Sequence, residues 1–267
     1  MQFLRKATII ILFRRREQEG ISENGIPCFV ISALHVAMYG RKGRETAMNL
    51  MDIIGPVMVG PSSSHTAGAA KIGRVSRRLI GERIVKAEIF FHGSFLATGK
   101  GHGTDRAIVA GLLGMKVDDP KIPHSFEIAA EQGMIFHIEG TDLGDVHPNS
   151  VKMHLTGESG RTLEVVAASI GGGSIQICEL DGLKADFSGD YPTLIVHNID
   201  KPGYVAEVTA VLAGEAVNIA TMKLHRGSRG DNAVMVIECD QEISEKCIRL
   251  LEETKGILKV TYLSMKE

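Results

Sequence analysis

The sequence is poor in cysteine, and the spacing of its cysteines excludes two common uses. The 267 residues include four, at Cys28, Cys178, Cys239 and Cys247. None forms a C-x-x-C pair, so the spacing predicts neither a disulfide framework nor a metal knuckle. This usage is typical of a reducing compartment. We therefore expect a cytoplasmic protein with no metal site of its own.

Long hydrophobic runs are also missing. The apolar runs near the start, in ATIIILF and IPCFVISALHVAMYG, are shorter than the roughly 18–20 residues that span a bilayer. The first run ends at RRR with no small-residue cleavage site after it, so we expect neither a secretory signal nor a membrane partner. The net charge of −2 gives no reason to expect nucleic acid as a partner.

Several catalytic motifs are absent as well. The chain contains no G-x-S-x-G nucleophile elbow, no H-E-x-x-H helix and no G-x-x-x-x-G-K-[ST] phosphate loop. Its glycine-rich stretch at 99–103 has the wrong order for a dinucleotide fingerprint. A pyridoxal-phosphate deaminase is disfavoured, because no glycine-rich phosphate loop follows a candidate Schiff-base lysine.

Composition divides the chain into three regions. Residues 1–47 carry eight basic and four acidic residues, a charge of +4, whereas the remainder carries −6. They lack periodicity, and we expect a weakly ordered extension that folding does not require. Residues 48–190 mix helical and strand patterns, and residues 191–267 form a second compact unit.

The middle region predicts an α+β domain with a mixed sheet. Helices are expected over 66–81 and 104–115, the second opened by a Thr/Asp cap. Strands are expected over 84–93, 150–157, 162–170 and 171–180, and a linker over 181–192. The last region predicts strands at 193–199, 217–227, 232–240 and 257–265 with helices at 203–214 and 244–256. That β-α-β-β-α-β order is ferredoxin-like.

The stretch GPSSSHT, residues 60–66, is dense in small hydrogen-bonding groups before a helix. A serine there can cap the helix while the remaining first-turn N–H groups attract an anion such as a carboxylate. His65 is then placed to exchange a proton near neutral pH. The alternative is simply an N-cap with more polar groups than it needs.

Histidines are concentrated in the same region, since seven of the ten fall between His65 and His154. In GSFLATGKGHGTD, residues 93–105, glycines 99, 101 and 103 allow close backbone approach or positive φ, and His102 lies three residues before Asp105. Asp105 either orients an imidazole or caps the helix. By default, HPN at 147–149 is a turn and GGG at 171–173 a bend.

Together, these segments resemble a known family. DIIGPVMVGPSSSHTAGA, GSFLATGKGHGTD, HPNSVKMHL and SIGGG occur in the order found in the beta portion of iron–sulfur-dependent L-serine dehydratases. The resemblance covers about residues 48–190. The following segment, NIDKPGYVAEVTAVLAGEAVNIATM, looks like an ACT domain, an addition typical of the beta chain in two-subunit members.

The resemblance implies conversion of L-serine to pyruvate and ammonia. It also implies a four-iron, four-sulfur cluster ligated by a separate alpha chain, so that this chain alone is inactive. The implied catalytic residues are His65, His102 and Asp105, although the alpha chain is an alternative source of the base. The implied substrate-binding residues are Ser62, Ser63, Ser64, Thr66, Gly101, Thr104, Asn149 and Gly172.

The ACT resemblance implies an amino-acid site in the loop after its first strand, across paired copies. Its residues would be Asn198, Asp200, Pro202, Gly203 and Asn218. The alternative is a domain that only dimerises or stiffens the assembly. A second function also stays open, because residues 48–190 resemble the allosteric substrate-binding domain beside ACT domains in some phosphoglycerate dehydrogenases. On that interpretation the chain is a non-catalytic, amino-acid-binding regulatory module.

Overall fold

The computed structural model describes residues 35–36, 48–49, 57–226 and 232–266 of the chain. Two compact units are present, Met1–Gly55 and Pro56–Glu267. In the first, strands β1 (His35–Val36) and β2 (Met48–Asn49) pair antiparallel. The rest of the predicted extension lies outside the described residues. No helix among the described residues is long and apolar enough to cross a membrane.

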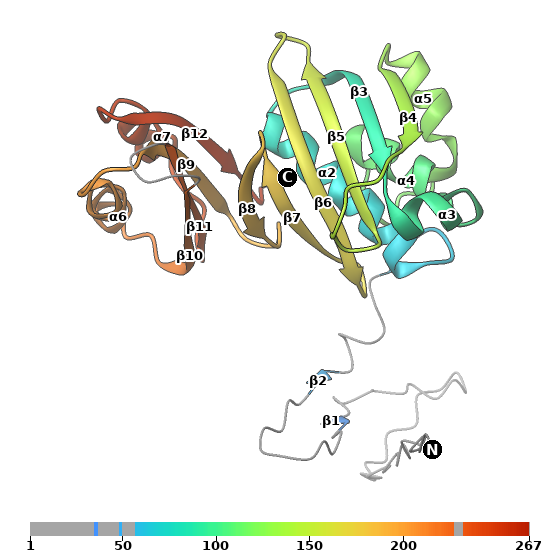
Figure 1. Ribbon diagram of the computed structural model, residues 1–267, viewed down its shortest axis with the longest axis horizontal. Coiled ribbons are helices and arrows are strands. Elements are labelled where there is room, and N and C mark those ends of the chain that lie inside the picture. The colour runs from blue at the N-terminus through green and yellow to red at the C-terminus, as the bar shows by residue number, and fades with distance from the viewer. Residues whose placement is uncertain (1–34, 37–47, 50–56, 227–231, 267) are drawn as a thin grey trace, which may run out of the picture. The chain divides into compact units, whose positions relative to one another are not determined.

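A six-stranded mixed sheet organises the second unit, in the order β4-β3-β5-β6-β7-β8 (Figure 1). The strands are β3 (Ile84–Phe91), β4 (Ile135–Gly140), β5 (Ser150–Gly157), β6 (Thr162–Gly171), β7 (Ser174–Leu180) and β8 (Leu183–Phe187). Only the β3–β4 pair is parallel, and the remaining pairs are antiparallel. The predicted mixed sheet is therefore confirmed.

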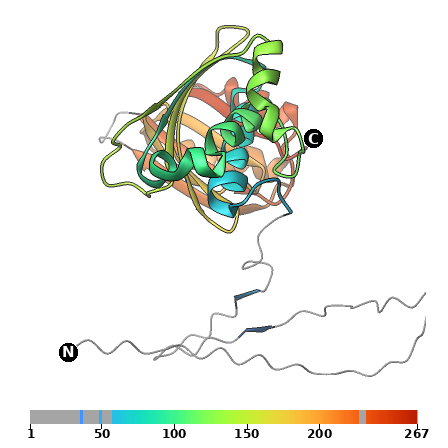
Figure 2. The same cartoon turned by 90° about the vertical axis from the view of Figure 1, so that its right-hand side faces the viewer.

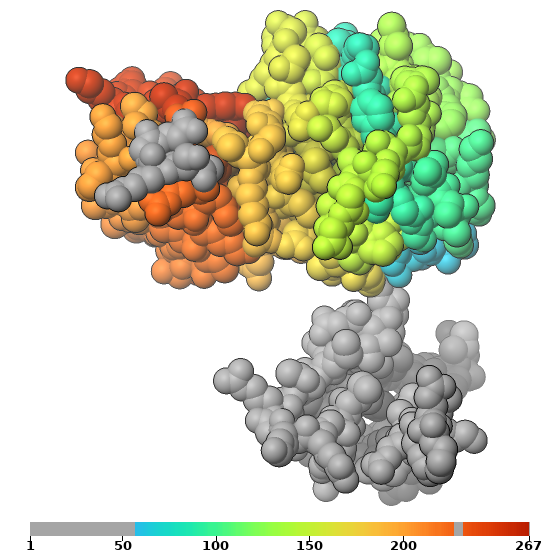
Figure 3. Space-filling view, viewed as in Figure 1, coloured from blue at the N-terminus to red at the C-terminus, as the bar shows by residue number. Residues whose placement is uncertain are grey.

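Helices cover one face of this sheet (Figures 1 and 2). They are the π-helix η1 (Ser63–Gly68), α2 (Ala69–Ile80), α3 (Gly93–His102), α4 (Thr104–Leu112), the 3₁₀ turn η2 (Ile122–His124) and α5 (Ser125–Glu131). Apolar side chains of α2 and α4 pack with inward-facing strand residues into one core. The other face is towards the viewer in Figure 3 with no described helix in front of it. It carries charged pairs such as Lys152–Glu164, 3.0 Å apart.

A second, antiparallel sheet follows in the order β10-β11-β9-β12. Its elements are β9 (Thr193–Ile199), α6 (Tyr204–Gly214), β10 (Ile219–Arg226), β11 (Asn232–Cys239), α7 (Glu245–Glu252) and β12 (Ile257–Leu263). The predicted β-α-β-β-α-β order is confirmed. Strand alternation divides the apolar residues: Leu194 joins the core under α6 and α7, whereas Ile195 joins the core of the larger sheet.

Two local predictions were wrong, and one helix was not predicted. The expected linker contains β8, because Ala185 and Phe187 alternate into the core after a tight turn at Asp181–Gly182, both with positive φ. The glycine-rich segment from residue 93 is a helix, α3, in which only Gly93 and the following Gly103 need positive φ. The start of α4 has no Thr or Asp side-chain cap, since Gly103 in the left-handed region occupies the N-cap.

Two glycines allow α2 and α4 to touch backbone to backbone. A Cβ on Gly73 would lie 2.3 Å from the Ile108 carbonyl oxygen, and one on Gly111 would lie 2.1 Å from the Ala70 carbonyl oxygen. No side chain fits at either distance. The separation of the two helices therefore depends on both residues being glycine.

Replacing Gly111 with alanine is expected to lower the free energy of unfolding by about 1–3 kcal/mol, because the added methyl forces the helices apart. Urea denaturation of the full chain measures this. Gly214→Ala is the matched control, since Gly214 ends α6 and an added methyl group there would have no atom within 4 Å. Equal stability for the two variants would contradict the close-contact explanation.

Candidate functional site

The segment Ser62–Thr66 begins the helical layer, as predicted. Ser62 is the extended N-cap residue, and its Oγ accepts a hydrogen bond from the His65 N–H at 3.1 Å. The Ser62 carbonyl accepts from the N–H groups of Thr66 at 2.9 Å and Ala67 at 3.3 Å. Residues Ser63–Gly68 then form a π-helix, in which hydrogen bonds join residues five apart instead of four. The predicted serine cap is confirmed.

His65 contacts α3 through its side chain. Its Nε2 lies 3.1 Å from the Ser94 Oγ and 3.0 Å from the Thr98 Oγ1. The ring of Phe95 meets the imidazole edge-on, with centroids 5.4 Å apart. Two hydroxyls and one aromatic ring thus fix the position of the imidazole.

These contacts favour one tautomer of His65. The Thr98 hydroxyl donates its single proton to the Ser94 carbonyl oxygen at 2.9 Å. Its contact with Nε2 is then a hydrogen bond only if Nε2 carries a proton. In the neutral ring this leaves the lone pair on Nδ1, which is the atom free to accept a proton.

Burial keeps this ring neutral. It lowers the pKa of His65 below its ordinary value of 6.5 because the charged form loses solvation. A hydrogen bond from the imidazole to the Ser94 backbone opposes this, and the nearby charge of His102 adds to it. At neutral pH, the neutral form of His65 therefore predominates.

His102 lies beside His65, with ring centroids 4.9 Å apart. Its Nδ1 is 3.2 Å from the Thr98 carbonyl oxygen, an acceptor, so Nδ1 is the donor and Nε2 is available. The Thr66 hydroxyl donates to the His102 carbonyl at 2.9 Å and ties η1 to the end of α3. The structure thus brings together two of the three predicted catalytic residues.

Asp105, the third, lies elsewhere. Its Oδ1 accepts the N–H of Arg106 at 2.8 Å, and it lines a cavity of about 470 Å³ on the Phe95 and Gly99 side of α3. The neighbouring Thr104 hydroxyl is buried without a hydrogen-bond partner. Gly101 is an exposed residue within α3. The roles predicted for these three residues stay predictions.

Asn149 joins the start of α3 to the end of β6. The preceding carbonyl, of Pro148, accepts the Ser94 N–H at 2.7 Å, and the Asn149 carbonyl accepts the Ser169 N–H at 3.0 Å. Gly172 lies in a turn in which all three glycines have positive φ, so the bend expected at 171–173 is confirmed.

Sequence reasoning missed Ser94, Thr98 and Ser169. Ser94 and Thr98 are four residues apart and therefore share a face of α3, a signal that needs the segment to be recognised as helical. The buried Ser169 hydroxyl lies against Gly68 of η1, where an added Cβ would be 2.1 Å away. No sequence pattern marks that contact.

The residues predicted for the ACT loop are divided between two ends of their sheet. Asn198 is the second-to-last residue of β9, and its buried Oδ1 has no hydrogen-bond partner. Asp200 pairs with Arg226 at 3.2 Å, while Pro202 and Gly203 (φ 107°) precede α6. Asn218 lies at the opposite end of the sheet, since the next residue, Ile219, pairs with Cys239 at the end of β11. Its side-chain amide donates to Asp240 at 2.5 Å.

The described cysteines do not fit an iron–sulfur cluster. Cys239 and Cys247 are buried in the core of the second sheet, and burial raises the pKa of Cys239 to about 11. Burial also raises the pKa of the half-buried Cys178. Within the part of the chain that the structure describes, no group of three His, Cys, Asp or Glu residues could hold a metal ion. Cys28 lies outside that part.

Comparison with known proteins gives a consistent result. The family model described as serine dehydratase beta chain matches residues 49–141. A probable L-serine dehydratase beta chain of Bacillus subtilis is 43% identical over 216 residues, covering 81% of this chain and 98% of that protein. The L-serine dehydratase beta chain of Peptoniphilus asaccharolyticus is 38% identical over 201 residues, covering 75% and 90%.

A more distant match is to a different enzyme. The D-3-phosphoglycerate dehydrogenase of Bacillus subtilis is 25% identical over 201 residues, covering 74% of this chain but only 37% of that protein. The two beta chains match at higher identity and over nearly their whole lengths. The chain therefore belongs to the serine dehydratase beta chain family.

Proposed function

We propose that this chain is the beta subunit of a two-chain, cytoplasmic L-serine dehydratase, a lyase that converts L-serine to pyruvate and ammonia. The proposal assigns the four-iron, four-sulfur cluster to the alpha chain. The observation that carries it is the contact of His65 with Ser94, Thr98 and His102 beside a helix N-terminus. The names of the beta-chain relatives support the reaction and the partner.

The start of η1 is proposed to bind the substrate carboxylate. The helical hydrogen bonds begin with the Thr66 and Ala67 N–H groups, which donate to the Ser62 carbonyl. The N–H groups of Ser63 and Ser64 precede them, at the helix end where a negative charge is favoured. The Ser64 hydroxyl and Asn149 complete the set of polar groups proposed to hold L-serine. The Thr66 hydroxyl, by contrast, donates to the backbone carbonyl of His102 and so helps to position that residue.

His65 is proposed to accept the Cα proton of L-serine at Nδ1. Loss of that proton and of the hydroxyl group gives an enamine, which water converts to pyruvate and ammonia. The lowered pKa of His65 keeps Nδ1 available at neutral pH. His102 Nε2 is proposed as a second proton acceptor, because the two imidazole rings lie with their centroids 4.9 Å apart.

The alternative function is a non-catalytic regulatory module. The match to a phosphoglycerate dehydrogenase and the separate four-stranded domain favour it. It gives no role to the paired imidazoles, because amino-acid binding alone needs no base. Anaerobic co-expression with candidate alpha chains, followed by a pyruvate assay, separates the two: pyruvate formed by the pair but by neither chain alone supports the lyase.

The second sheet is proposed to be an ACT domain that binds an amino acid at the loop 198–203. The buried Asn198 Oδ1 without a partner supports a polar ligand there. Gly203 is the N-cap residue of α6, so N–H groups at the start of this helix can face a carboxylate. Because Asn218 lies at the other end of the sheet, it enters such a site only through homo-association of two copies.

In the reconstituted heteromer, His65→Asn is expected to lower kcat by about 10²- to 10⁴-fold with little change in KM, because it removes the base and leaves the helix end intact. His124→Asn, an exposed change at the end of η2, is the control. Iron content of the complex is measured alongside. If His65→Asn keeps most of the turnover with the cluster intact, His65 is not the base.

NMR titration of the full chain is expected to give His65 a pKa below 6.5, and His102→Asn is expected to raise it, because one positive neighbour is removed. The unfolded chain binds the His65 proton at the ordinary pKa. Stability contributed by this residue is therefore complete above pH 6.5 and decreases as the pH falls towards the folded-state pKa. A His65 pKa above 6.5 would contradict the burial argument.

Calorimetry of the full chain with millimolar L-serine tests the ACT proposal. Asn198→Ala is expected to remove one binding event because the loop loses its buried acceptor. Asn232→Ala, an exposed asparagine at the start of the neighbouring β11, should leave that event unchanged. Identical isotherms for wild type and Asn198→Ala would contradict amino-acid binding at this loop. Association between subunits would then be the role left for the domain.

A further inference from the structure

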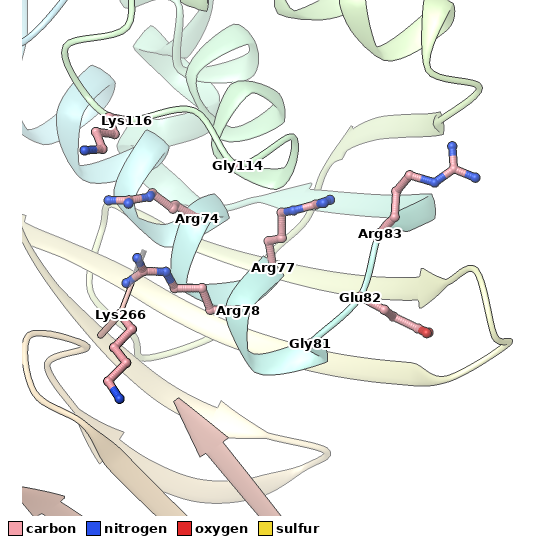
Figure 4. Close-up of a pocket in the computed structure, with 9 residues that line it drawn as sticks. All are labelled: Arg74, Arg77, Arg78, Gly81, Glu82, Arg83, Gly114, Lys116 and Lys266. Carbon is pink, nitrogen blue, oxygen red and sulfur yellow. The ribbon is translucent and has the colours of Figure 1, made fainter. Parts of the chain in front are cut away.

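A cavity of about 480 Å³ at the C-terminal end of α2 is lined mainly by basic side chains (Figure 4). They come from three separate segments: α2 and the residues after it, the turn after α4, and the tail after β12. The six are Arg74, Arg77, Arg78, Arg83, Lys116 and Lys266, and Glu82 is the only acidic residue of the lining.

This concentration of charge is unusual for the chain. Six basic residues and one acidic residue give the lining a charge of +5, while the whole chain carries −2. Everything else therefore sums to −7. The lining is thus net positive although the chain as a whole is net negative.

Two of the six have structural roles. The Arg77 guanidinium donates to the Leu112 carbonyl at 3.3 Å, and Arg83 bonds Glu158 at 3.1 Å and the Gln132 carbonyl at 2.9 Å. The Glu82 carboxylate accepts from the Ser159 hydroxyl at 2.8 Å. In Figure 4, Arg83 and Glu82 extend to one side of α2.

The other four form a group of cations. In Figure 4, the side chains of Arg74 and Arg78 extend to the other side of α2, where Lys116 also lies. Lys266, from the C-terminal tail, lies on this side as well, with its ammonium end directed away from Arg78. Arg74, Arg78 and Lys116 have polar interactions of their own within the chain, so their shared charge, rather than vacant hydrogen-bond positions, is what favours an anion here.

Helix stability explains only part of the cluster. Arginines in the last turn of α2 interact favourably with its carbonyl ends, which accounts for Arg77 and Arg78. Lys116 and Lys266 belong to other segments, so the last-turn preference of α2 does not account for their presence here. Burial, and then the charge of Arg83, lowers the pKa of Arg77, as expected for a part-buried cation with a second cation near it.

We propose that this cavity binds a small molecule carrying two or more negative charges on phosphate groups. Arginine forks match phosphate oxygens in pairs, and the volume lies in the range of small-molecule sites. The site is distinct from the serine site, because α2 has 12 residues, about 18 Å, and His65 lies before its start. The proposal goes beyond the proposed function and does not depend on it.

Isothermal titration of the full chain with inorganic pyrophosphate tests this at low and at physiological salt. We expect one pyrophosphate per chain, with affinity that falls as salt screens the charges. Arg74→Gln with Arg78→Gln should weaken binding by at least about tenfold. Lys116→Gln with Lys266→Gln, on different segments, should do the same and guards against misfolding of the first pair.

The matched control is Arg249→Gln with Lys255→Gln, which removes two exposed charges at α7 and beyond. Weakening confined to the two cavity variants, with unchanged thermal unfolding, supports the site. Equal weakening of pyrophosphate binding in the control would show that net charge alone causes the effect, and would overturn the proposed site. Absence of pyrophosphate binding also overturns it, and loss of alpha-chain capture by the cavity variants would then identify the face as a protein-docking surface.

Discussion

The close contact between α2 and α4 is the constraint on which the candidate site depends. η1 continues directly into α2, and α3 leads into α4 through Gly103. When Gly73 and Gly111 bring α2 and α4 into backbone contact, the segments before them, η1 and α3, are brought together as well. His65 from one segment then reaches Ser94 and Thr98 of the other. The position of the His65 imidazole therefore depends on the packing of α2 against α4.

The chemistry of His65 follows from a small set of hydrogen bonds. A backbone carbonyl takes the Thr98 proton, and that choice decides which ring nitrogen carries hydrogen. Another carbonyl, on Thr98, does the same for His102. Each ring thus has one nitrogen bonded to a residue of α3 and one that takes no part in these bonds. Main-chain geometry, rather than a carboxylate partner, sets both tautomers.

Much of the fold could be predicted, because alternating apolar residues identify strands buried on one face. β5 and β9 begin and end at the predicted residues. α3 was missed because Gly93, Gly99 and Gly101 hide its helical period, and β8 because aspartates and glycines surround its short alternation. In both segments, glycine interrupts the apolar periodicity, whereas the structure uses it for turns and close packing.

The site was predictable in part for the same reason. His65 and His102 were identified because each lies beside a motif with its own physical logic. Ser94 and Thr98 were missed with the helix that carries them, and the Gly68–Ser169 contact depends on a tertiary approach that no local pattern encodes. Asp105 is adjacent to the site in sequence, yet the left-handed turn at Gly103 starts a new helix and carries it towards another cavity.

The order of strands in the larger sheet has a consequence for synthesis of the chain. β3 leaves the ribosome before both of its partners: β4 follows only after three helices, and β5 later still. Strands β5, β6 and β7, by contrast, each pair with the next strand along the chain. Gly73 and Gly111 both emerge before β3 has any strand partner. The helix pair is thus complete in sequence before the sheet is, and it offers β3 an apolar surface to cover until β4 and β5 arrive.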